Sequence, residues 1–478
     1  MSKTQISLEN FFIFNSTFGP NEGEEENKIL LFHPEIEKNE KLKNIGYIEA
    51  LVKFTGSFTL EPTSNRDVMT MKTKKFTKFF FEPEKDFWIV MTVKNPKEQK
   101  TKDNREYTEY YTDDVHTDVF SKILQRCYLN FRLFCNTFEH NMIGTDHESK
   151  VDHLRMKLDN FYMKYLVTLN LKNCDILDLI QCIQYKAVSH LIFFKIVNLI
   201  NMLISIKNLK IKKCIFLYNQ EVVYSSISPD DLFIINEYMM ESLFPKYFRL
   251  KSNQGLDSDR SVGGFVTENE TETPQNAPKV YLYGDGKGRF ECETFRMAIY
   301  NIMDISLVML VEDDDDALND EFCNEIKYSI GPQLGLISKE ISDGITQIQQ
   351  NLTKSQIEDS IQKNFIYCNH RNYRFHACFN ENSNENTLSN REGKKSSHLS
   401  LSIMNLLSDL YSKELTEELI DSERETIIKT FNDYWIVKKY FNYRSLYLII
   451  HKNSTLIDVA EESSRLLSEI VKNVYFTN

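Results

Sequence analysis

The sequence contains little glycine and proline, only two tryptophans, and no excess of positive charge. Its 478 residues include 15 Gly and 10 Pro, and 69 acidic side chains against 57 Lys and Arg give a formal net charge of -12. The scarcity of glycine and proline excludes collagen-like repeats and wholly disordered chains. Because affinity for duplex nucleic acid rests largely on Lys and Arg that neutralise phosphates, the acidic balance argues against a nucleic-acid-binding protein.

The chain also lacks the signs of a secreted or membrane-spanning protein. Its nine cysteines are scattered singly, and residues 1–10 are polar without the charged and then apolar order of a signal peptide. These features predict a reducing, intracellular compartment with free thiols. The most apolar stretch, residues 188–206, contains Lys195 near its centre, and a central lysine costs about 2.5–3.5 kcal/mol in a membrane span. We therefore predict a buried amphipathic helix there and no transmembrane helix.

No segment matches a motif for covalent chemistry. Gly284–Gly288 lacks the hydroxyl and the following helix that a phosphate loop needs. Two cysteines and two histidines lie close together in the sequence: Cys368, His370, His376 and Cys378. This set is a candidate zinc site, but its one-residue separations fit the alternation of a strand better than a tetrahedral site. We expect no catalytic residue, no metal, no cofactor, and a protein that is not an enzyme.

The periodicity of apolar residues predicts an α+β protein with a repeated architecture. In the first part we expect strands at 8–15, 28–33, 76–81 and 87–94, a helix at 39–55, an exposed loop at 95–105 and two amphipathic helices after it. Antiparallel hairpins with helices packed on the sheet give an α+β layered domain. A similar order recurs twice, which predicts three domains at residues 1–172, 173–345 and 346–478. Polar insertions occupy 251–278 and 380–395, and we expect the second to be disordered.

Six segments resemble the vacuolar fusion protein family named for calcium-caffeine-zinc sensitivity, the CCZ family. They are FFIFNSTFGPNEGEEENKILLFHP (Phe11–Pro34), KNEKLKNIGYIEALVKF (Lys38–Phe54), FEPEKDFWIVMTVKNP (Phe81–Pro96), SLFP (Ser242–Pro245), IGPQL (Ile330–Leu334) and NDYWIV (Asn432–Val437). The resemblance runs over essentially the whole chain in the same order, and it is most specific at the amino-terminal end.

Resemblance to this family implies three longin domains, each a five-stranded antiparallel sheet flanked by helices. It also implies a heterodimer with the monensin-sensitivity (Mon) subunit, with a third scaffold subunit as an open question. The pair would act as guanine-nucleotide exchange factor for the Rab GTPase of late endosomes, lysosomes and vacuoles, in endosome maturation, fusion and autophagy. The chain would then be cytoplasmic and recruited peripherally to those membranes. The alternative is a longin-type trafficking adaptor or tethering scaffold without exchange activity.

The helix at 39–55 has two apolar stripes. At about 100° per residue, one stripe contains Leu42, Ile45, Ile48 and Val52, and the other contains Tyr47, Leu51 and Phe54. A surface helix normally buries one stripe against its own sheet. We therefore predict that Tyr47, Leu51 and Phe54 contact the partner subunit or the GTPase. The alternative is that a later helix of the same chain covers them.

Two groups of lysines are candidates for contact with anionic lipid. The first contains Lys72, Lys74, Lys75 and Lys78, and the second contains Lys207, Lys210, Lys212 and Lys213. Since the chain is acidic overall, peripheral membrane contact would need such local basic segments. The alternative for both groups is a solvated loop or strand edge.

Overall fold

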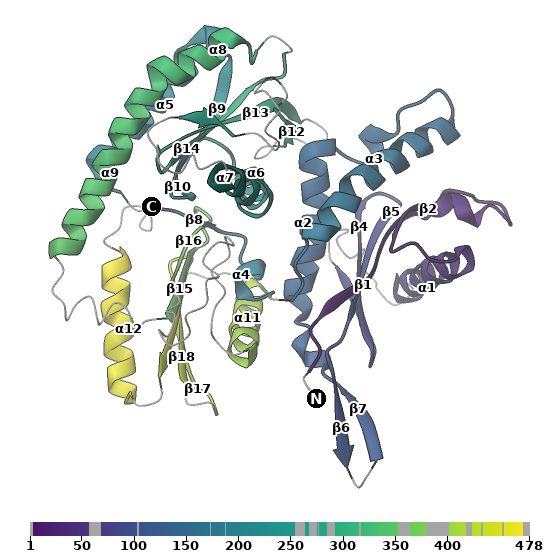
Figure 1. Cartoon of the computed structure of the whole chain (residues 1–478). Helices are drawn as coiled ribbons and strands as arrows, with labels where there is room; N and C mark the ends of the chain where they lie inside the picture. Colours follow the sequence, from purple (N-terminus) through teal and green to yellow (C-terminus); the bar gives the residue numbers. More distant parts are fainter. Residues whose placement is uncertain are drawn as a thin grey trace. The chain divides into compact units, whose positions relative to one another are not determined.

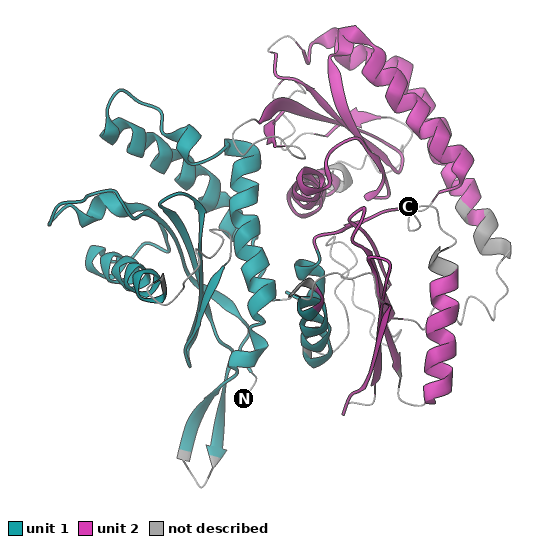
Figure 2. Ribbon diagram, turned by 180° about the vertical axis from the view of Figure 1, so that it is seen from behind, with its two compact units in different colours: residues 1–180, 400–413 teal, residues 181–399, 414–478 magenta. Residues whose placement is uncertain are grey.

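The computed structural model describes residues 3–56, 68–102, 105–172, 174–186, 188–253, 263–266, 275, 277–283, 292–314, 317–351, 364–378, 401–416, 423–431, 434–451 and 454–471. Two compact units are present, residues 1–180 with 400–413, and residues 181–399 with 414–478 (Figure 2). Each unit is described by itself below. None of the described helices is long and apolar enough to cross a bilayer.

The first unit contains a five-stranded antiparallel sheet in the order β2-β1-β5-β4-β3. The strands are β1 (Ser7–Asn15), β2 (Ile29–His33), β3 (Met69–Lys72), β4 (Phe76–Glu84) and β5 (Phe87–Lys94). Successive side chains on a strand point to opposite faces, so Phe12 and Phe14 lie on one face and Phe11 on the other. The predicted strands and the predicted hairpin of β1 with β2 are confirmed.

Helices cover both faces of this sheet (Figure 1). Helix α1 (Lys38–Gly56) packs on the face of Phe12 and Phe14. On the opposite face, α2 (Thr117–Cys135) and α3 (His147–Thr168) follow, with Phe120 stacked on Phe79 at 5.7 Å and Tyr162 against Phe11 at 5.0 Å between ring centroids. The short α4 (Ile176–Leu179) ends this part of the unit.

The prediction of an exposed loop at 95–105 is wrong. Strands β6 (Lys97–Lys102) and β7 (Arg105–Tyr110) form a separate two-stranded antiparallel sheet that extends beyond the first sheet (Figure 1). The segment is rich in charge, yet its backbone pairs from Lys97 with Tyr110 to Lys102 with Arg105. Across this hairpin Lys100 pairs with Glu109, and the Tyr111 hydroxyl donates to Glu98 at 2.7 Å. The polar composition of residues 95–105 was therefore not enough to predict a loop.

The described residues of the second unit form two sheets, and the first of them is a six-stranded antiparallel sheet. Its strands are β9 (Ile211–Tyr218), β10 (Glu221–Ser225), β11 (Gly264–Phe265), β12 (Lys279–Leu282), β13 (Glu293–Ile302) and β14 (Ile305–Glu312). The helices are α5 (His190–Ser205), α6 (Pro229–Tyr238), α7 (Phe244–Asn253), α8 (Asp320–Glu325) and α9 (Gly331–Asn351). Part of the polar insertion at 251–278 thus contributes β11, whereas most of it lies outside the described residues.

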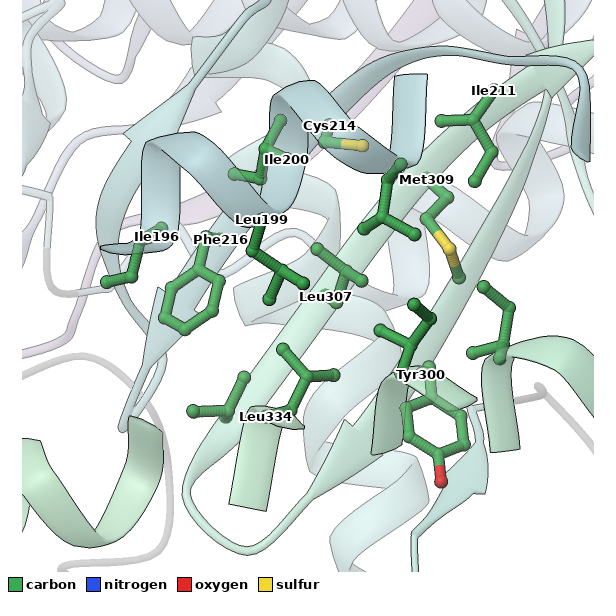
Figure 3. Packing of buried hydrophobic residues seen from close by; sticks show 14 of the residues in the cluster. Ile196, Leu199, Ile200, Ile211, Cys214, Phe216, Tyr300, Leu307, Met309 and Leu334 are labelled. Carbon is green, nitrogen blue, oxygen red and sulfur yellow. The ribbon is translucent and has the colours of Figure 1, made fainter. Parts of the chain in front are cut away.

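Helices α5 and α9 bury one apolar stripe each against this sheet. Ile196, Leu199 and Ile200 of α5 point toward Phe216 and Leu307 of the strands (Figure 3). The predicted helix within 188–206 is therefore confirmed, and its inner stripe is buried. Its outer side is apolar too, because Leu191 and Phe194 stay 68% and 62% exposed.

The third sheet has the strand order β17-β18-β19-β15-β16-β8. Its strands are β8 (Ile183–Gln184), β15 (Asn364–Asn369), β16 (Arg374–Cys378), β17 (Arg424–Lys429), β18 (Tyr434–Phe441) and β19 (Arg444–His451). Helix α12 (Leu456–Val471) covers one face through Val459 and Leu466. Helix α11 (Leu401–Thr416) precedes β17, and its residues from Glu414 onward belong to this unit.

The α+β class is confirmed, with antiparallel sheets flanked by helices. The expectation of five strands in every sheet is wrong for the second and third sheets, which have six each among the described residues, and β8 joins β16 in parallel. The domain boundaries at 172 and 345 remain predictions. The segment predicted to be disordered, 380–395, lies outside the described residues.

Candidate functional site: the outward face of helix α1

Helix α1 is held to the first sheet by a narrow apolar stripe. Ile45 and Ile48 are 2% and 0% exposed and pack in a cluster with Phe12, Phe14 and other sheet residues. At the edge of this contact, Lys28 Nζ lies 2.8 Å from Glu49 Oε1. The stripe predicted to face the sheet therefore does so through its two central residues.

Two of the three residues predicted to face a partner are exposed. Tyr47 and Phe54 keep 45% and 63% of their surface in contact with solvent. No helix in the described part of the chain buries them, so the alternative of a covering helix finds no support in the structure. Whether these side chains bind a partner stays a prediction.

Leu51 differs from its two companions. It is half-buried and packs against the cluster that contains Ile48. The reason is geometric, because residues three apart on a helix lie on neighbouring positions of its surface, which brings Leu51 beside Ile48. The prediction that the whole second stripe is uncovered is therefore wrong at Leu51.

Two residues that contact the Tyr47 side chain come from the neighbouring strands β3 and β4. The Tyr47 hydroxyl donates to Sδ of Met71 at 2.9 Å, and Lys78 Nζ lies 5.4 Å from the centre of the Tyr47 ring. Lys78 also donates to Oδ1 of Asn44 at 3.1 Å. We call the surface formed by Tyr47, Phe54, Met71 and Lys78 the α1 face.

Lys78 is a partly desolvated cation on the α1 face. Burial lowers its pKa from the ordinary lysine value, because removal from water disfavours the charged form. No carboxylate forms an ion pair with Lys78 among the residues that the structure describes. The α1 face thus combines apolar side chains with a positive charge that an acidic group could compensate.

The two lysine groups differ in how their charges are compensated. Lys72, Lys74 and Lys75 are exposed around the end of the β3–β4 hairpin, whereas Lys78 belongs to the α1 face. In the second group, Lys212 pairs with Glu312 at 2.8 Å, Lys213 pairs with Glu293 at 3.1 Å, and Lys210 contacts Asp314, while Lys207 is exposed. Since carboxylates already neutralise three of its four lysines, the second group offers less attraction to an anionic surface. Lipid contact by either group stays a prediction.

The four residues of the candidate zinc site do not converge. Cys368 is paired with Phe375 across β15 and β16, and Tyr367 is paired with His376. Because neighbouring residues of a strand face opposite sides, Cys368 lies on one face of the sheet, and His376 and Cys378 lie on the other. The described residues contain no cluster of three or more side chains arranged to hold a metal ion.

A buried polar cluster around Glu414 was not predicted from the sequence. This carboxylate is 4% exposed and accepts hydrogen bonds from the hydroxyls of Ser445 and Tyr447, the latter at 2.7 Å. Nε2 of His370 lies 2.9 Å from Glu414 Oε1, and Nζ of Lys438 lies 3.1 Å from Oε2. The residues come from four separate segments, so no local pattern could have shown the cluster.

The surroundings of Glu414 keep it ionised. Burial opposes ionisation, but hydrogen bonds from His370 and Ser445 and the electrostatic interactions with His370 and Lys438 outweigh it and lower the pKa of Glu414 to about 2. Both carboxylate oxygens of Glu414 are contacted by side chains of the chain itself. We therefore assign the cluster a structural role, as an anchor of the carboxyl-terminal end of α11 on β18 and β19.

Comparison with family models shows the class of protein to which the chain belongs. Three family models match the chain in succession: "First Longin domain of INTU, CCZ1 and HPS4" at residues 8–136, "Intu longin-like domain 2" at 211–331 and "Intu longin-like domain 3" at 359–466. Together with the three helix-flanked sheets, these matches define a protein with three longin-like domains.

The family follows from relatives that match over nearly the full length. The chain is 34% identical over 488 residues to the vacuolar fusion protein CCZ1 homolog of Xenopus laevis, covering 98% of this chain and 97% of the relative. It is 32% identical over 488 residues to the Nematostella vectensis homolog, with 99% of both covered, and 23% identical over 491 residues to that of Dictyostelium discoideum, with 98% of both covered. The chain belongs to the CCZ1 family of vacuolar fusion proteins, which confirms the resemblance and supports a role in membrane trafficking.

Proposed function

We propose that the chain is one subunit of a heterodimeric guanine-nucleotide exchange factor, in which the α1 face contacts a Mon-family subunit or the Rab GTPase itself. The GTPase is the Rab of late endosomes, lysosomes and vacuoles, and the complex would act in endosome maturation, fusion and autophagy. The observation that carries the proposal is the exposure of Tyr47 and Phe54 on a helix that already buries its own stripe.

The composition of the α1 face suits a protein interface. Tyrosine is enriched among the residues that dominate binding energy, because its ring gives a large contact area for few rotatable bonds. Phe54 adds apolar area beside it. An acidic side chain of a partner would compensate the charge of Lys78, whose amino group is already partly withdrawn from water.

Exchange needs no acid, base or nucleophile from the chain. A GTPase holds its nucleotide through the phosphate loop and a magnesium ion. A factor that binds the nucleotide-free form better must weaken nucleotide affinity by the same ratio, since the coupling between two ligands is reciprocal. The chemical requirement is therefore a shaped surface that stabilises the open GTPase, which is compatible with a chain whose sequence offers no catalytic motif.

Membrane recruitment belongs to the same proposal. We infer that the cytoplasmic complex reaches late endosomal, lysosomal or vacuolar membranes peripherally, with Lys72, Lys74 and Lys75 as the exposed basic residues available for anionic lipid. Each lysine close to an anionic surface contributes about 1 kcal/mol. A third scaffold subunit is a further partner that co-purification would reveal.

The alternative is a longin-type adaptor or tethering scaffold, which would bind the same partners without promoting exchange. The test is release of a fluorescent GDP analogue from the Rab GTPase in the presence of excess GTP. The chain alone, the Mon-family subunit alone and the co-purified pair are compared at equal concentration. We expect the pair to accelerate release and each subunit alone to leave it near the intrinsic rate. A pair that binds the GTPase and leaves the release rate unchanged would establish the adaptor instead.

A further inference from the structure

Helix α3 of the first unit carries a second apolar stripe on its outward side. Its inward stripe of Val151, Leu154, Leu158, Tyr162 and Leu166 is buried in the core of the unit. On the outward side, Met156, Met163 and Val167 are 54%, 46% and 82% exposed. These side chains contribute little to the core of the first unit, so their grouping on one helix requires a different explanation.

The spacing of the outward stripe is that of a coiled-coil seam. Met156, Asn160, Met163 and Val167 follow one another at steps of four, three and four residues. This places the two methionines at d positions of a heptad and Asn160 and Val167 at a positions. A single asparagine at an a position fixes the register of paired helices, because the two amides bond to each other in only one alignment.

The charges beside the seam are sorted by sign. The e positions hold Lys150, Lys157 and Lys164, and two g positions hold Asp152 and Asp159. Asp152, Asp159 and Lys164 are exposed, and Lys157 is half-buried. One edge of the stripe therefore carries lysines and the other carries two aspartates, of which Asp152 also pairs with Arg155 of the same helix at 3.2 Å. Charges of opposite sign at e and g positions are the arrangement that selects a partner helix.

This order of charges also selects the orientation of the partner. In a parallel pair, a g residue faces an e residue of the other helix, so Asp152 would face Lys157 and Asp159 would face Lys164. In an antiparallel pair, e faces e and g faces g, which brings like charges together. A second α3 helix in parallel therefore pairs both aspartates with lysines, whereas an antiparallel one places like charges opposite each other.

We propose that the outward stripe of α3 pairs in parallel, in register at Asn160, with α3 of a second copy of this chain. The seam from Met156 to Val167 is about 17 Å long at 1.5 Å per residue, so the contact is smaller than the roughly 1,200 Å² of a stable interface. It forms at high local concentration, such as that of several copies gathered at one surface. The proposal stands independently of exchange activity, and its test uses the chain alone.

The test places a cysteine at the centre of the seam of the full-length chain. The variant Asn160→Cys is treated with a short bismaleimide cross-linker at high protein concentration, and the product that joins the two introduced thiols is quantified by mass spectrometry. The matched control is Thr168→Cys, since Thr168 is exposed on the same helix but lies at a b position outside the seam. The unsubstituted chain gives the background of its native cysteines. We expect Asn160→Cys to cross-link at least about tenfold more than Thr168→Cys, because only seam positions come close together in a parallel pair.

The second part of the experiment reverses the charges on either side of the seam. In the Asn160→Cys background, Lys157→Glu with Lys164→Glu makes both edges acidic, and Asp152→Lys with Asp159→Lys makes both edges basic. Each variant alone should lose about tenfold of its cross-linking, and an equal mixture of the two should regain it as a mixed product.

Two results would overturn the proposal. The first is a similar cross-linking yield in Asn160→Cys and Thr168→Cys. The second is a yield in the Asn160→Cys background that does not respond to charge reversal and mixing. If a charge variant fails to fold, the comparison of the two single-cysteine variants decides.

Discussion

The first and the third longin-like domains differ in the side chains that they bury and expose. The third domain buries a carboxylate, Glu414, among the side chains of His370, Lys438, Ser445 and Tyr447. The first domain leaves two aromatic rings, Tyr47 and Phe54, in contact with water on α1. The carboxylate is compensated by hydrogen bonds and ion pairs within the chain, whereas 45% of Tyr47 and 63% of Phe54 remain exposed to solvent.

This difference indicates which of the two regions stabilises the fold and which is available for binding. The Glu414 cluster is completed by the chain itself, so it explains how the end of α11 is fixed and requires no partner. Tyr47 and Phe54 of the α1 face stay 45% and 63% exposed, and an exposed apolar patch next to a partly desolvated cation is a feature of interaction sites. Changes in the Glu414 cluster should therefore affect stability, and changes in the α1 face should affect binding.

The largest effect is expected from Glu414→Gln. Glu414 is buried, and Lys438, which pairs with it, is 13% exposed in its side chain; removal of the negative charge from such a pair costs about 3–5 kcal/mol. Amide hydrogen exchange along β18 and β19 measures the loss of local stability. The control is Glu425→Gln, because the pair of Glu425 with Lys439 is 43% exposed on the glutamate side and should be worth less than about 1 kcal/mol. Equal losses in the two variants would contradict a structural role for the cluster.

Ile48→Ala and Phe54→Ala should separate the two sides of α1. Ile48 is completely buried, and truncation of a buried isoleucine to alanine costs about 2–5 kcal/mol. Phe54 is mostly exposed, so its truncation should change the stability of the first unit by less than about 0.5 kcal/mol. Hydrogen exchange in β1 and β5 gives both values. A large loss of stability with Phe54→Ala would show that the ring is part of the core.

The pH dependence of the second unit should carry the signature of Glu414. Its pKa is lowered from 4.5 to about 2, so its contribution of about 3 kcal/mol is fully present above pH 4.5. The contribution is lost as the pH falls from 4.5 toward 2, where the folded carboxylate takes up a proton. The urea midpoint for loss of the third sheet, measured between about pH 6 and about pH 2.5, should fall more steeply in the unsubstituted chain than in Glu414→Gln. Parallel pH profiles would refute the assignment.

The two lysine groups should differ in their effect on membrane binding. Lys72, Lys74 and Lys75 replaced together by glutamine should weaken flotation with vesicles of anionic lipid, by about 1 kcal/mol for each lysine near the surface. The same replacement of Lys210, Lys212 and Lys213 should have little effect, since each of these already contacts a carboxylate. Equal flotation of both variants and the unsubstituted chain would remove lipid contact from the proposal.

Local patterns predicted the helices and most strands, because alternation and helical spacing are properties of short segments. The stripe of Ile45 and Ile48, the hairpin of β1 with β2 and the helix within 188–206 were found in this way. Pairings between distant segments were not accessible. The addition of β8 to the third sheet, the ion pairs of Lys212 and Lys213, and the Glu414 cluster depend on residues brought together from different parts of the chain.

The sequence predicted only the part of the candidate site that lies on one helix. Helical spacing placed Tyr47 and Phe54 on the outward side of α1, where the structure shows them. It assigned Leu51 to the outward stripe, although Leu51 lies three residues after Ile48 and is half-buried against the same cluster. It could not show Met71 and Lys78, which reach the α1 face from β3 and β4.

The α1 face is the surface that we propose binds a partner of the exchange complex. Its most direct test is the double variant Tyr47→Asp with Phe54→Asp, which leaves the half-buried Leu51 intact. The matched control is Phe431→Asp, an exposed apolar residue of the third domain. Co-purification with a Mon-family subunit and nucleotide release from the Rab GTPase are measured for both, after hydrogen exchange has shown that the first sheet is folded. We predict that the double variant loses complex formation or exchange while Phe431→Asp keeps both. Normal complex yield and normal exchange in the double variant would contradict a partner-binding role for the α1 face.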